Sequence, residues 1–454
     1  MKTSILTAFI TTIAFNAFAQ DSLMFHRISD EIMLHGTCYD NLYTLCKKVG
    51  HRLAGSPAAA KAVRWGEQAM KEAGADKVWL QPVDVPHWVR GEEHLYIKPE
   101  DGRKVEIPML SIGNSEGTGG ALWEAPIVMV KDMDEFKKLS DDEVRDKIIF
   151  FDYHFRQDII FTFEGYGDAV KYRWMAPNLA ASRGALAVII RSVSTGDDDF
   201  PHTGSLHYAD SLKHIPAVAI GNYNADWLVK KCKQGAATAY LRSECHMMPE
   251  TVRSYNVIGE IKGSEHPEKI VLVGGHLDSW DVGEGAHDDG TGCVQSIEVI
   301  RTLKALGIRP KYTVRAVLFM NEENGLKGGL AYADSARANN EEHILAIETD
   351  AGGFSPRGFG FDMPAKKKAQ ILKYKTLFLP YGVYDFGRDE GGADISPLKK
   401  MGVPMAGLIP DPQRYFDLHH TNNDVFEQVN HRELKLGAVA LTGMVYLISE
   451  HGLK

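Results

Sequence analysis

The chain has 454 residues, of which 44% are hydrophobic and 24% are charged, and its formal net charge is −9 at pH 7. This length exceeds one ordinary hydrophobic core and predicts two or three domains. The negative charge argues against a nucleic-acid-binding protein, since the longest basic run is the three lysines at 366–368.

The first twenty residues, MKTSILTAFITTIAFNAFAQ, combine a lysine, an apolar run and an Ala-Phe-Ala ending. We predict a signal peptide over residues 1–19, cleaved after Ala19, with export to the periplasm or the medium. The alternative is a buried first helix, which the polar pair DS directly afterwards disfavours. No later run approaches ~20 apolar residues, so we expect no membrane-spanning helix.

Three elements follow before the composition changes. The pattern predicts a helix at residues 57–73, closed by Gly74, and a strand at 77–85. A hairpin is expected at residues 93–108, around Asp101-Gly102. We assign all three to the sheet that resumes near residue 250.

A Gly/Ser-rich seam at residues 111–120 opens a second unit, placed at 113–249. Its predicted strands and helices are strands 126–130, 147–151, 185–191 and 217–221, and helices 168–182 and 225–234. The motif PHTG contains His202, which has two interpretations. It contacts the substrate, or, about three times as often for a loop histidine, it is structural or solvated.

The stretch at residues 271–292, VLVGGHLDSWDVGEGAHDDGTG, concentrates metal-binding side chains. An apolar, β-branched run at 269–275 and a helical pattern at 293–306 predict a buried parallel strand followed by a helix. His276 then lies just past the carboxyl end of the strand, where open α/β sheets bind ligands. Asp278, two residues on, points to the same side and is placed to orient the imidazole.

Asp288 and Asp289 follow a Gly-rich turn, and a carboxylate there is well placed to bridge two cations. The competing interpretation is a solvated acidic turn. A lone match of this kind has about one chance in ten of being functional. The additional acids and histidines farther along the chain are what favour the metal site.

Two more predicted strands, at residues 312–320 and 343–349, end in Glu322-Glu323 and in Asp350. Neighbouring residues of a strand diverge, so one glutamate can bind metal while the other faces the substrate. A fourth strand, at 405–409, precedes His419-His420. Each group alone fits a solvated surface, but together they predict one rim of ligands.

The ordered set GGHLDSW, GAHDDGTG, NEENG, ETDAGG and HHTNND resembles the co-catalytic zinc aminopeptidase and carboxypeptidase family of peptidase clan MH. The resemblance covers nearly the whole mature chain, including HRLAGS, HWVRGEE and PHTG. It implies an α/β fold whose mixed, mostly parallel sheet is flanked by helices and carries an inserted protease-associated-like α/β domain. The catalytic domain is then residues 20–112 and 250–454, and the insert is 113–249.

The resemblance also implies two zinc ions and their ligands. One ion takes His276 and Asp350, the other takes His420 and Glu323, and Asp288 bridges both. We choose His420 over His419 because the family's ligand stands four residues before an acid, here Asp424. His419 then falls where relatives place a residue that touches the substrate near the oxyanion.

In the same resemblance Glu322 is the general base and acid, and Asp278 is the partner that orients His276. Three ligand carboxylates against two divalent ions leave one positive charge for a hydroxide to neutralise. Nitrogen and oxygen ligands without a thiolate suit zinc, although manganese or cobalt tolerates such a set. The metal pair is expected to lower the pKa of a bridging water towards ~7, and Glu322 to pass its proton to the leaving amine.

The loop FGRDEGGADISP, at residues 386–397, corresponds to one that relatives place around the substrate. Arg388 and Asp394 in it either hold a peptide terminus or pair with each other. The sequence departs from the family here, so exact specificity is left open.

These features predict an exported dinuclear zinc exopeptidase that hydrolyses dipeptides or short peptides with a free N-terminus. The alternatives are a carboxypeptidase, a glutaminyl cyclase with a single zinc, and a non-catalytic binding protein on a peptidase fold. We expect no cofactor besides the metals. The resemblance alone implies a homodimer.

Overall fold

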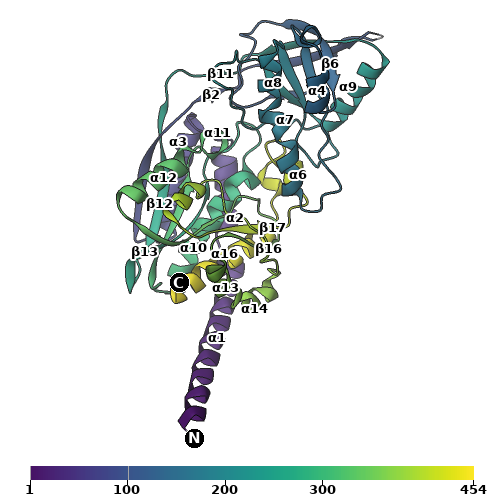
Figure 1. Cartoon of the computed structure of the whole chain (residues 1–454). Helices are drawn as coiled ribbons and strands as arrows, with labels where there is room; N and C mark the ends of the chain where they lie inside the picture. The colour runs from purple at the N-terminus through teal and green to yellow at the C-terminus, as the bar shows by residue number, and fades with distance from the viewer. Residues whose placement is uncertain (1, 101) are drawn as a thin grey trace.

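Two sheets organise the chain, and Figure 1 shows them one above the other. The computed structural model describes residues 2–100 and 102–454, with side chains from residue 19 onwards. The lower, seven-stranded sheet carries the predicted ligand loops, and the upper, eight-stranded sheet contains most of the predicted insert. A small two-stranded ribbon lies between them, formed by β2 (Trp88–Val89) and β11 (His246–Met247).

The seven-stranded sheet has its parallel strands at the centre and antiparallel strands at both edges. Its order is β1 (Lys77–Val85), β12 (Val252–Ile261), β14 (Tyr312–Phe319), β13 (His266–His276), β15 (Glu342–Glu348), β17 (Met405–Pro410) and β16 (Pro356–Asp362). The pairs β14–β13, β13–β15 and β15–β17 are parallel. The predicted mixed α/β fold is confirmed.

The central strands are buried on both faces, which explains their continuous apolar runs. In β13, Val271 and Val273 join one core cluster, whereas Ile270 and Leu272 join the cluster on the opposite face. This is the two-residue alternation of a strand. The strand is thus held by two hydrophobic layers, which fixes the position of the residue at its carboxyl end.

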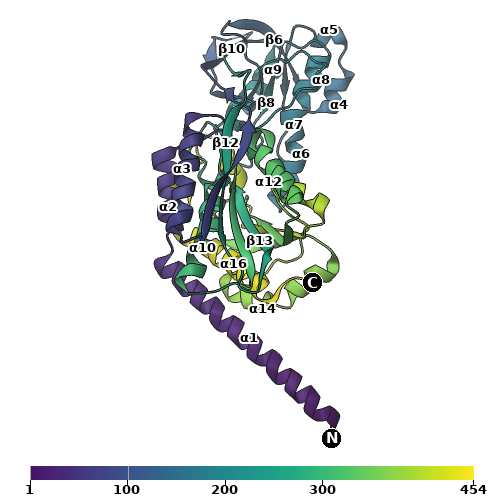
Figure 2. The ribbon, with the colours of Figure 1, turned by 90° about the vertical axis from the view of Figure 1, so that its left-hand side faces the viewer.

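Helices cover both faces of this sheet (Figures 1 and 2). On one face lie α3 (Pro57–Glu72), α10 (Thr291–Ala305), α16 (His431–His451) and the later part of α1 (Lys2–His35). On the other lie α12 (Lys327–Ala338) and η4 (Ser396–Met401). The predicted helices at 57–73 and 293–306 correspond to α3 and α10.

Shorter elements complete the part of the chain around this sheet. They are α2 (Cys38–Thr44), η1 (Leu45–Val49), η2 (Ala286–Gly290), α11 (Glu322–Gly325), α13 (Ala365–Leu372), α14 (Lys375–Phe378), η3 (Leu379–Tyr381), α15 (Tyr415–Leu418) and η5 (Phe426–Gln428). Three of these elements carry or adjoin the predicted ligands: η2 contains Asp288, α11 begins at Glu322, and α15 ends directly before His419.

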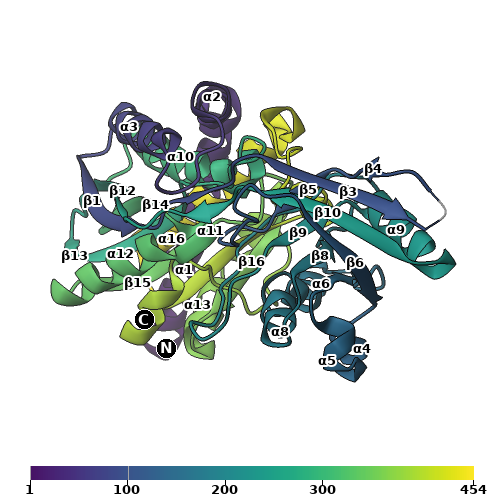
Figure 3. The same ribbon diagram turned by 90° about the horizontal axis from the view of Figure 1, so that it is seen from above.

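The eight-stranded sheet has a parallel centre of its own, seen to the right in Figure 3. Its order is β4 (Val105–Glu106), β3 (Glu93–Pro99), β10 (Ala237–Ser243), β6 (Trp123–Val130), β7 (Ile148–Phe151), β8 (Ala187–Arg191), β9 (Ala217–Ile220) and β5 (Met109–Ser111). Separate core clusters cover its two faces.

The placement of the early hairpin was wrong. β3 pairs with β4 and with β10, so both hairpin strands belong to the eight-stranded sheet rather than to the sheet of β1. The alternation of a strand predicts a hairpin, but it does not predict which sheet the hairpin joins. Pairing with distant strands decides that. We therefore propose a boundary near residue 90 instead of 112. The predicted turn residue Asp101 lies outside the described residues.

The helices of the upper unit lie beside its sheet. They are α4 (Met133–Lys138), α5 (Asp141–Val144), α6 (Thr162–Ala169), α7 (Lys171–Trp174), α8 (Ala176–Ser182) and α9 (Asn222–Gln234). The predicted helix at 168–182 is broken into α6, α7 and α8. Pro177 stands at the start of α8, where a missing N–H is tolerated. Figure 1 shows α6 and α7 reaching down towards the seven-stranded sheet.

The first helix, α1, extends away from the body at its N-terminal end (Figures 1 and 2). Met1 and the side chains of residues 2–18, where the predicted signal peptide falls, lie outside the described part. From Asp21 onwards the helix is attached: the Asp21 carboxylate accepts hydrogen bonds from Tyr446 (3.2 Å) and His451 (3.1 Å). Across the described residues, none of the helices combines the length and apolarity needed to cross a bilayer.

Candidate active site

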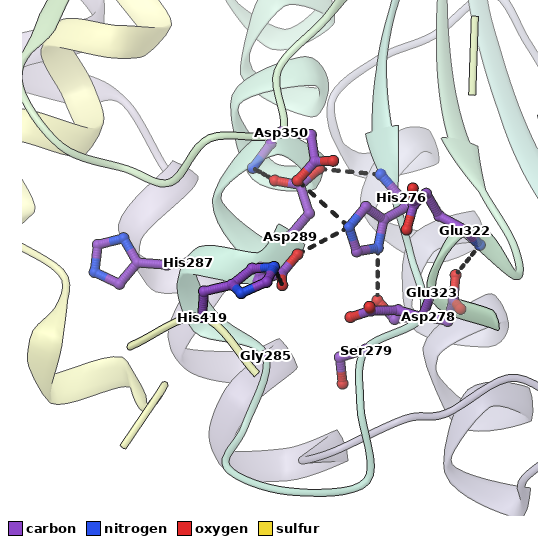
Figure 4. A network of polar contacts seen from close by, with 12 residues as sticks. His276, Asp278, Ser279, Gly285, His287, Asp289, Glu322, Glu323, Asp350 and His419 are labelled. Atoms are coloured by element: carbon purple, nitrogen blue, oxygen red, sulfur yellow. Dashed lines mark hydrogen bonds and ion pairs between the residues drawn. The ribbon is translucent and has the colours of Figure 1, made fainter. Parts of the chain in front are cut away.

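Three neighbouring strand ends form the site. β14, β13 and β15 run parallel, so their carboxyl ends meet at one edge of the sheet. The end of β13 supplies His276, the turn after β14 supplies Glu322 and Glu323, and the turn after β15 supplies Asp350. Figure 4 shows these side chains pointing towards one another.

The first group of ligand candidates forms around His276. Its Nε2 lies 3.1 Å from Asp288 Oδ1 and 3.5 Å from Asp350 Oδ1. Its Nδ1 lies 3.0 Å from the main-chain carbonyl oxygen of Asp278 and can donate to it. That hydrogen bond leaves the Nε2 lone pair facing the two carboxylates, as in a metal-binding histidine.

The second group forms around His420. Its Nε2 lies 3.1 Å from Asp288 Oδ2 and 3.1 Å from Glu323 Oε2. Its Nδ1 lies 3.2 Å from the carbonyl oxygen of Thr203, and the Thr203 N–H donates to the His420 carbonyl at 3.0 Å. His419 stacks on His420 with ring centroids 3.4 Å apart, but its Nε2 stays 3.8 Å from Asp288. The geometry favours His420 as the ligand.

Asp288 stands between the two groups, with Oδ1 towards His276 and Oδ2 towards His420. Its loop is fixed by Asp424, whose carboxylate accepts the N–H groups of His287 (2.7 Å) and Asp288 (3.1 Å). The peptide between Asp288 and Asp289 is cis. Asp289 turns away from the rim and accepts the N–H of His276 (3.0 Å). Of the adjacent aspartates, only Asp288 faces both histidines.

Asp278 makes a different contact from the one expected. Its main-chain oxygen, not its carboxylate, meets His276. The carboxylate Oδ1 instead accepts the N–H groups of Asn321 (2.6 Å) and Glu322 (3.1 Å). Since Asn321 has a left-handed backbone with φ of 72°, this carboxylate stabilises a tight turn. Asp278 therefore positions Glu322 directly and His276 through the main chain.

Buried and half-buried carboxylates crowd this edge. Burial raises the pKa of Glu323 to about 7, and the neighbouring Asp288 adds to the shift. Burial also raises the pKa of Glu322 well above its usual range, and the negative charges of Asp350 and Glu323 raise it further. Repulsion of this kind is relieved by protons or by bound cations.

The donor set fits divalent cations. Asp288 Oδ2 and Asp350 Oδ1 are buried, and no hydrogen-bond donor of the described residues satisfies them. A cavity of about 10 Å³ lies against Asp288, Glu323 and His420, which is close to the volume of one small ion or water. Two imidazoles and three carboxylates offer nitrogen and oxygen donors only, which suits zinc.

Arg52, in the motif HRLAGS, is a residue for which the sequence indicated no role. It is fully buried, and its guanidinium donates to the carbonyl oxygens of Leu277 (2.6 Å), Glu284 (2.7 Å) and Gly285 (2.9 Å). These carbonyls belong to the two ends of the loop between His276 and Asp288. Arg52 thus links the two ends of the ligand loop through hydrogen bonds. The only sequence signal is that Arg52 lies in the motif HRLAGS, which contributes to the family resemblance.

Replacing Arg52 with methionine should lower the free energy of unfolding by about 3 kcal/mol or more, because three buried carbonyls lose their charged donor. Urea unfolding of the chelated protein measures this without a contribution from metal. Arg432→Met, at an exposed position at the start of α16, is the control and should unfold like wild type. Equal midpoints for Arg52→Met and wild type would contradict the bracing role.

Two more side chains from the upper unit reach the second group. Arg173 Nη1 lies 3.4 Å from the Thr203 carbonyl and 3.3 Å from His420 Nδ1, and its Nη2 donates to the hydroxyl of Tyr166 (2.9 Å). The predicted substrate residue His202 is buried, and its Nδ1 donates to the His419 carbonyl (2.7 Å). His202 therefore supports the His419-His420 backbone. Arg173 carries no sequence signal, since neither its helix nor its spacing resembles a site.

Arg388 and Asp394 lie apart from each other. Arg388 pairs with Asp385 (3.0 Å) and with Glu164 (3.6 Å). Asp394 is buried beside Glu348, which accepts the Asp394 N–H at 3.4 Å, and its own carboxylate has no hydrogen-bond partner among the described residues. The proposed Arg388–Asp394 ion pair is wrong. One residue of the loop faces outwards, and the other turns into the core.

The chain is similar to known peptidases in sequence and in fold. The model of "Peptidase family M28" matches residues 256–442. Human carboxypeptidase Q is 34% identical over 414 residues, 91% of this chain and 85% of that protein. The crystal structure of a peptidase M28 precursor from Shewanella amazonensis SB2B is 31% identical, covers 96% of this chain and 98% of its own, and has a TM-score of 0.91.

A zinc aminopeptidase from Bacillus subtilis, 21% identical, shares the fold with a TM-score of 0.65, covering 91% of this chain and 95% of its own. The sequence resemblance is confirmed by the extent of the carboxypeptidase Q match, which spans both sheets. On that ground the chain belongs to the metallopeptidases of family M28.

Proposed function

We propose that the protein is a dinuclear zinc exopeptidase that hydrolyses dipeptides or short peptides with a free N-terminus. The observation that carries this proposal is the position of Asp288, whose two oxygens face two separate histidine and carboxylate groups. A carboxylate in that position is able to bridge two cations. His276 and Asp350 would hold one ion, and His420 and Glu323 the other.

Bound metals would polarise the scissile carbonyl and lower the pKa of water at the site. The residues of the chain supply the proton transfers. Glu322 is half-buried at the rim, and its main-chain N–H donates to Asp278. The positive charge of bound metals would offset the raised pKa of Glu322, so that its carboxylate can take a proton from the attacking water and return it to the leaving amine. Its adjacent residue Glu323 turns the other way, towards His420.

The choice of a free N-terminus is supported by charge. A cavity of about 250 Å³ adjoins Asp350, and its charged lining side chains are Glu348, Asp350 and Glu390. An ammonium group suits such surroundings, whereas a carboxylate is repelled. We call this the inner cavity. The name carboxypeptidase Q in the relatives keeps carboxypeptidase activity as the second candidate.

The test is a substrate panel with the mature protein. We expect unblocked dipeptides to be cleaved, amino-acid anilides to be cleaved more slowly, N-acylated dipeptides to resist, and about two zinc ions per chain. Turnover of N-acylated dipeptides would instead show a carboxypeptidase. Absence of turnover with one zinc would favour the cyclase, and absence of turnover without metal a binding protein.

We propose that the chain is exported and that the mature protein starts at Gln20. The supporting observation is that the packed part of α1 begins at the next residue, Asp21, with its contacts to Tyr446 and His451. Phe25, Ile28 and Ile32 are buried after it, so cleavage after Ala19 leaves the packed part intact. The resemblance also implies a homodimer, and light scattering on the same sample would measure its molar mass.

A further inference from the structure

Three neighbouring cavities share lining residues one with the next, and the first of them adjoins the predicted ligand Asp350. The inner cavity is lined by Phe163 and Glu390 as well as Glu348 and Asp350. A middle cavity of about 280 Å³ also touches Phe163 and Glu390. An outer cavity of about 610 Å³ shares Phe161, Glu164 and Arg388 with the middle one. The shared side chains therefore stand at the two boundaries between neighbouring cavities.

The residues at these boundaries come from opposite sides. Phe161, Phe163 and Glu164 belong to the upper unit, at the start of α6, whereas Arg388 and Glu390 belong to the loop before η4. We call these five residues the bar.

Contacts across the second boundary close the bar. The Arg388 guanidinium carbon lies 3.5 Å from the centroid of the Phe161 ring, and Arg388 Nη1 lies 3.6 Å from Glu164 Oε1. Asp385 holds the other side of the guanidinium at 3.0 Å. A cation over an aromatic face with two carboxylates around it is an attractive arrangement. Electrostatic attraction therefore holds this boundary in addition to packing.

The first boundary is held by packing. Phe163 stacks on Tyr415 with centroids 5.3 Å apart and meets Phe416 edge-on at 4.9 Å. Thr162 anchors the same segment, because its hydroxyl donates to the carbonyl of Pro412 at 2.7 Å. The Phe163 ring is therefore a fixed wall rather than a mobile cover.

We propose that the bar makes this protein an exopeptidase by ending the substrate site just beyond the N-terminal residue. This inference rests on the proposed function. With the ammonium group in the inner cavity, beside Glu348 and Glu390, any extension of the substrate at its N-terminus would have to pass Phe163. The middle cavity, which shares Phe163 with the inner one, would receive such an extension.

The experiment compares one dipeptide with its N-benzoyl derivative. In wild type the ratio of kcat/KM for the blocked over the free dipeptide should be low. Phe163→Ala, which opens the first boundary, should raise this ratio by about ten-fold or more, since removal of a blocking side chain from a pocket has effects of that size. Phe163→Leu keeps most of the bulk and should stay near wild type.

A second pair of variants tests the other boundary with a longer blocking group, such as benzoyl-glycyl. Phe163→Ala/Arg388→Ala should accept it better than Phe163→Ala alone. The matched control is Phe163→Ala/Arg357→Ala, because Arg357 lines only the outer cavity. Thermal unfolding of each variant shows whether the fold is kept.

The same ratios are measured as binding constants by calorimetry in a Glu322→Gln background, where turnover is not needed. If Phe163→Ala leaves both the turnover ratio and the binding ratio at the wild-type value, the proposed role of the bar is wrong. That conclusion holds even if the wild-type protein cleaves free dipeptides. A wild type that cleaves the benzoyl dipeptide as well as the free one would reject both the bar and the proposed specificity. A wild type that cleaves neither, together with a raised binding ratio in the opened variants, would keep the bar and reject the proposed activity.

Discussion

Glu322→Gln should lower kcat for an unblocked dipeptide by about three orders of magnitude while the chain keeps its full metal content. Glutamine has the same size as glutamate, and the main-chain N–H of residue 322 still donates to Asp278. The turn after β14 is therefore preserved. The amide, however, cannot take up the proton of the attacking water. Steady-state kinetics and metal analysis of the same purified sample measure both properties.

The adjacent Glu323 provides the matched control. Its Oε2 lies 3.1 Å from His420 Nε2, so Glu323→Gln should release metal from the second group and lose activity for that reason. Adding excess zinc should restore part of the activity of Glu323→Gln and none of that of Glu322→Gln. If instead Glu322→Gln lost metal and responded to zinc, the roles of the two glutamates would be exchanged.

Asp288→Asn should reduce the bound zinc from about two ions per chain to one or fewer. The substitution removes the negative charge that both groups share and replaces one oxygen by an NH₂ group, which cannot bind a cation. Loss of an outer hydrogen-bonding partner alone costs ~10–100-fold in metal affinity, and loss of a shared ligand should cost more. Titration against a competing chelator measures both affinities.

Asp281→Asn is the control for Asp288→Asn, because it makes the same chemical change in the same loop but outside the site. Asp281 accepts hydrogen bonds from Arg90 at 2.6 and 2.8 Å, and its loss should leave the zinc content at the wild-type value. Two tightly bound zinc ions in Asp288→Asn would contradict the bridging role.

The strand ends of the site were predictable because their signals are local. Each of His276, Glu322 and Asp350 follows an apolar, β-branched run, and the carboxyl ends of parallel strands must share one edge of the sheet. The same argument does not say which atom of a residue makes a contact. Asp278 lies beside His276 as expected, yet the peptide oxygen faces the ring, since the tight turn at Asn321 takes the carboxylate.

Other features depend on pairings between distant segments and leave no local trace. The strand β3 alternates in the same way whichever sheet it joins, and its partner β10 lies about 140 residues later in the chain. Arg388 and Asp394 are six residues apart in one loop, but Asp394 is drawn into the core beside Glu348 while Arg388 meets Phe161 of the upper unit. Loop residues are placed by what surrounds them.

The contacts of Thr203 with His420 have a mechanical consequence. The N–H and carbonyl of Thr203 both engage His420, and Thr203 belongs to the upper unit while His420 belongs to the lower one. Any hinge motion that lifts one unit from the other must break these contacts or drag the imidazole with it. If the two units separate, His420 loses both contacts with Thr203, so the second group of ligands would be held in place only while the two units stay together.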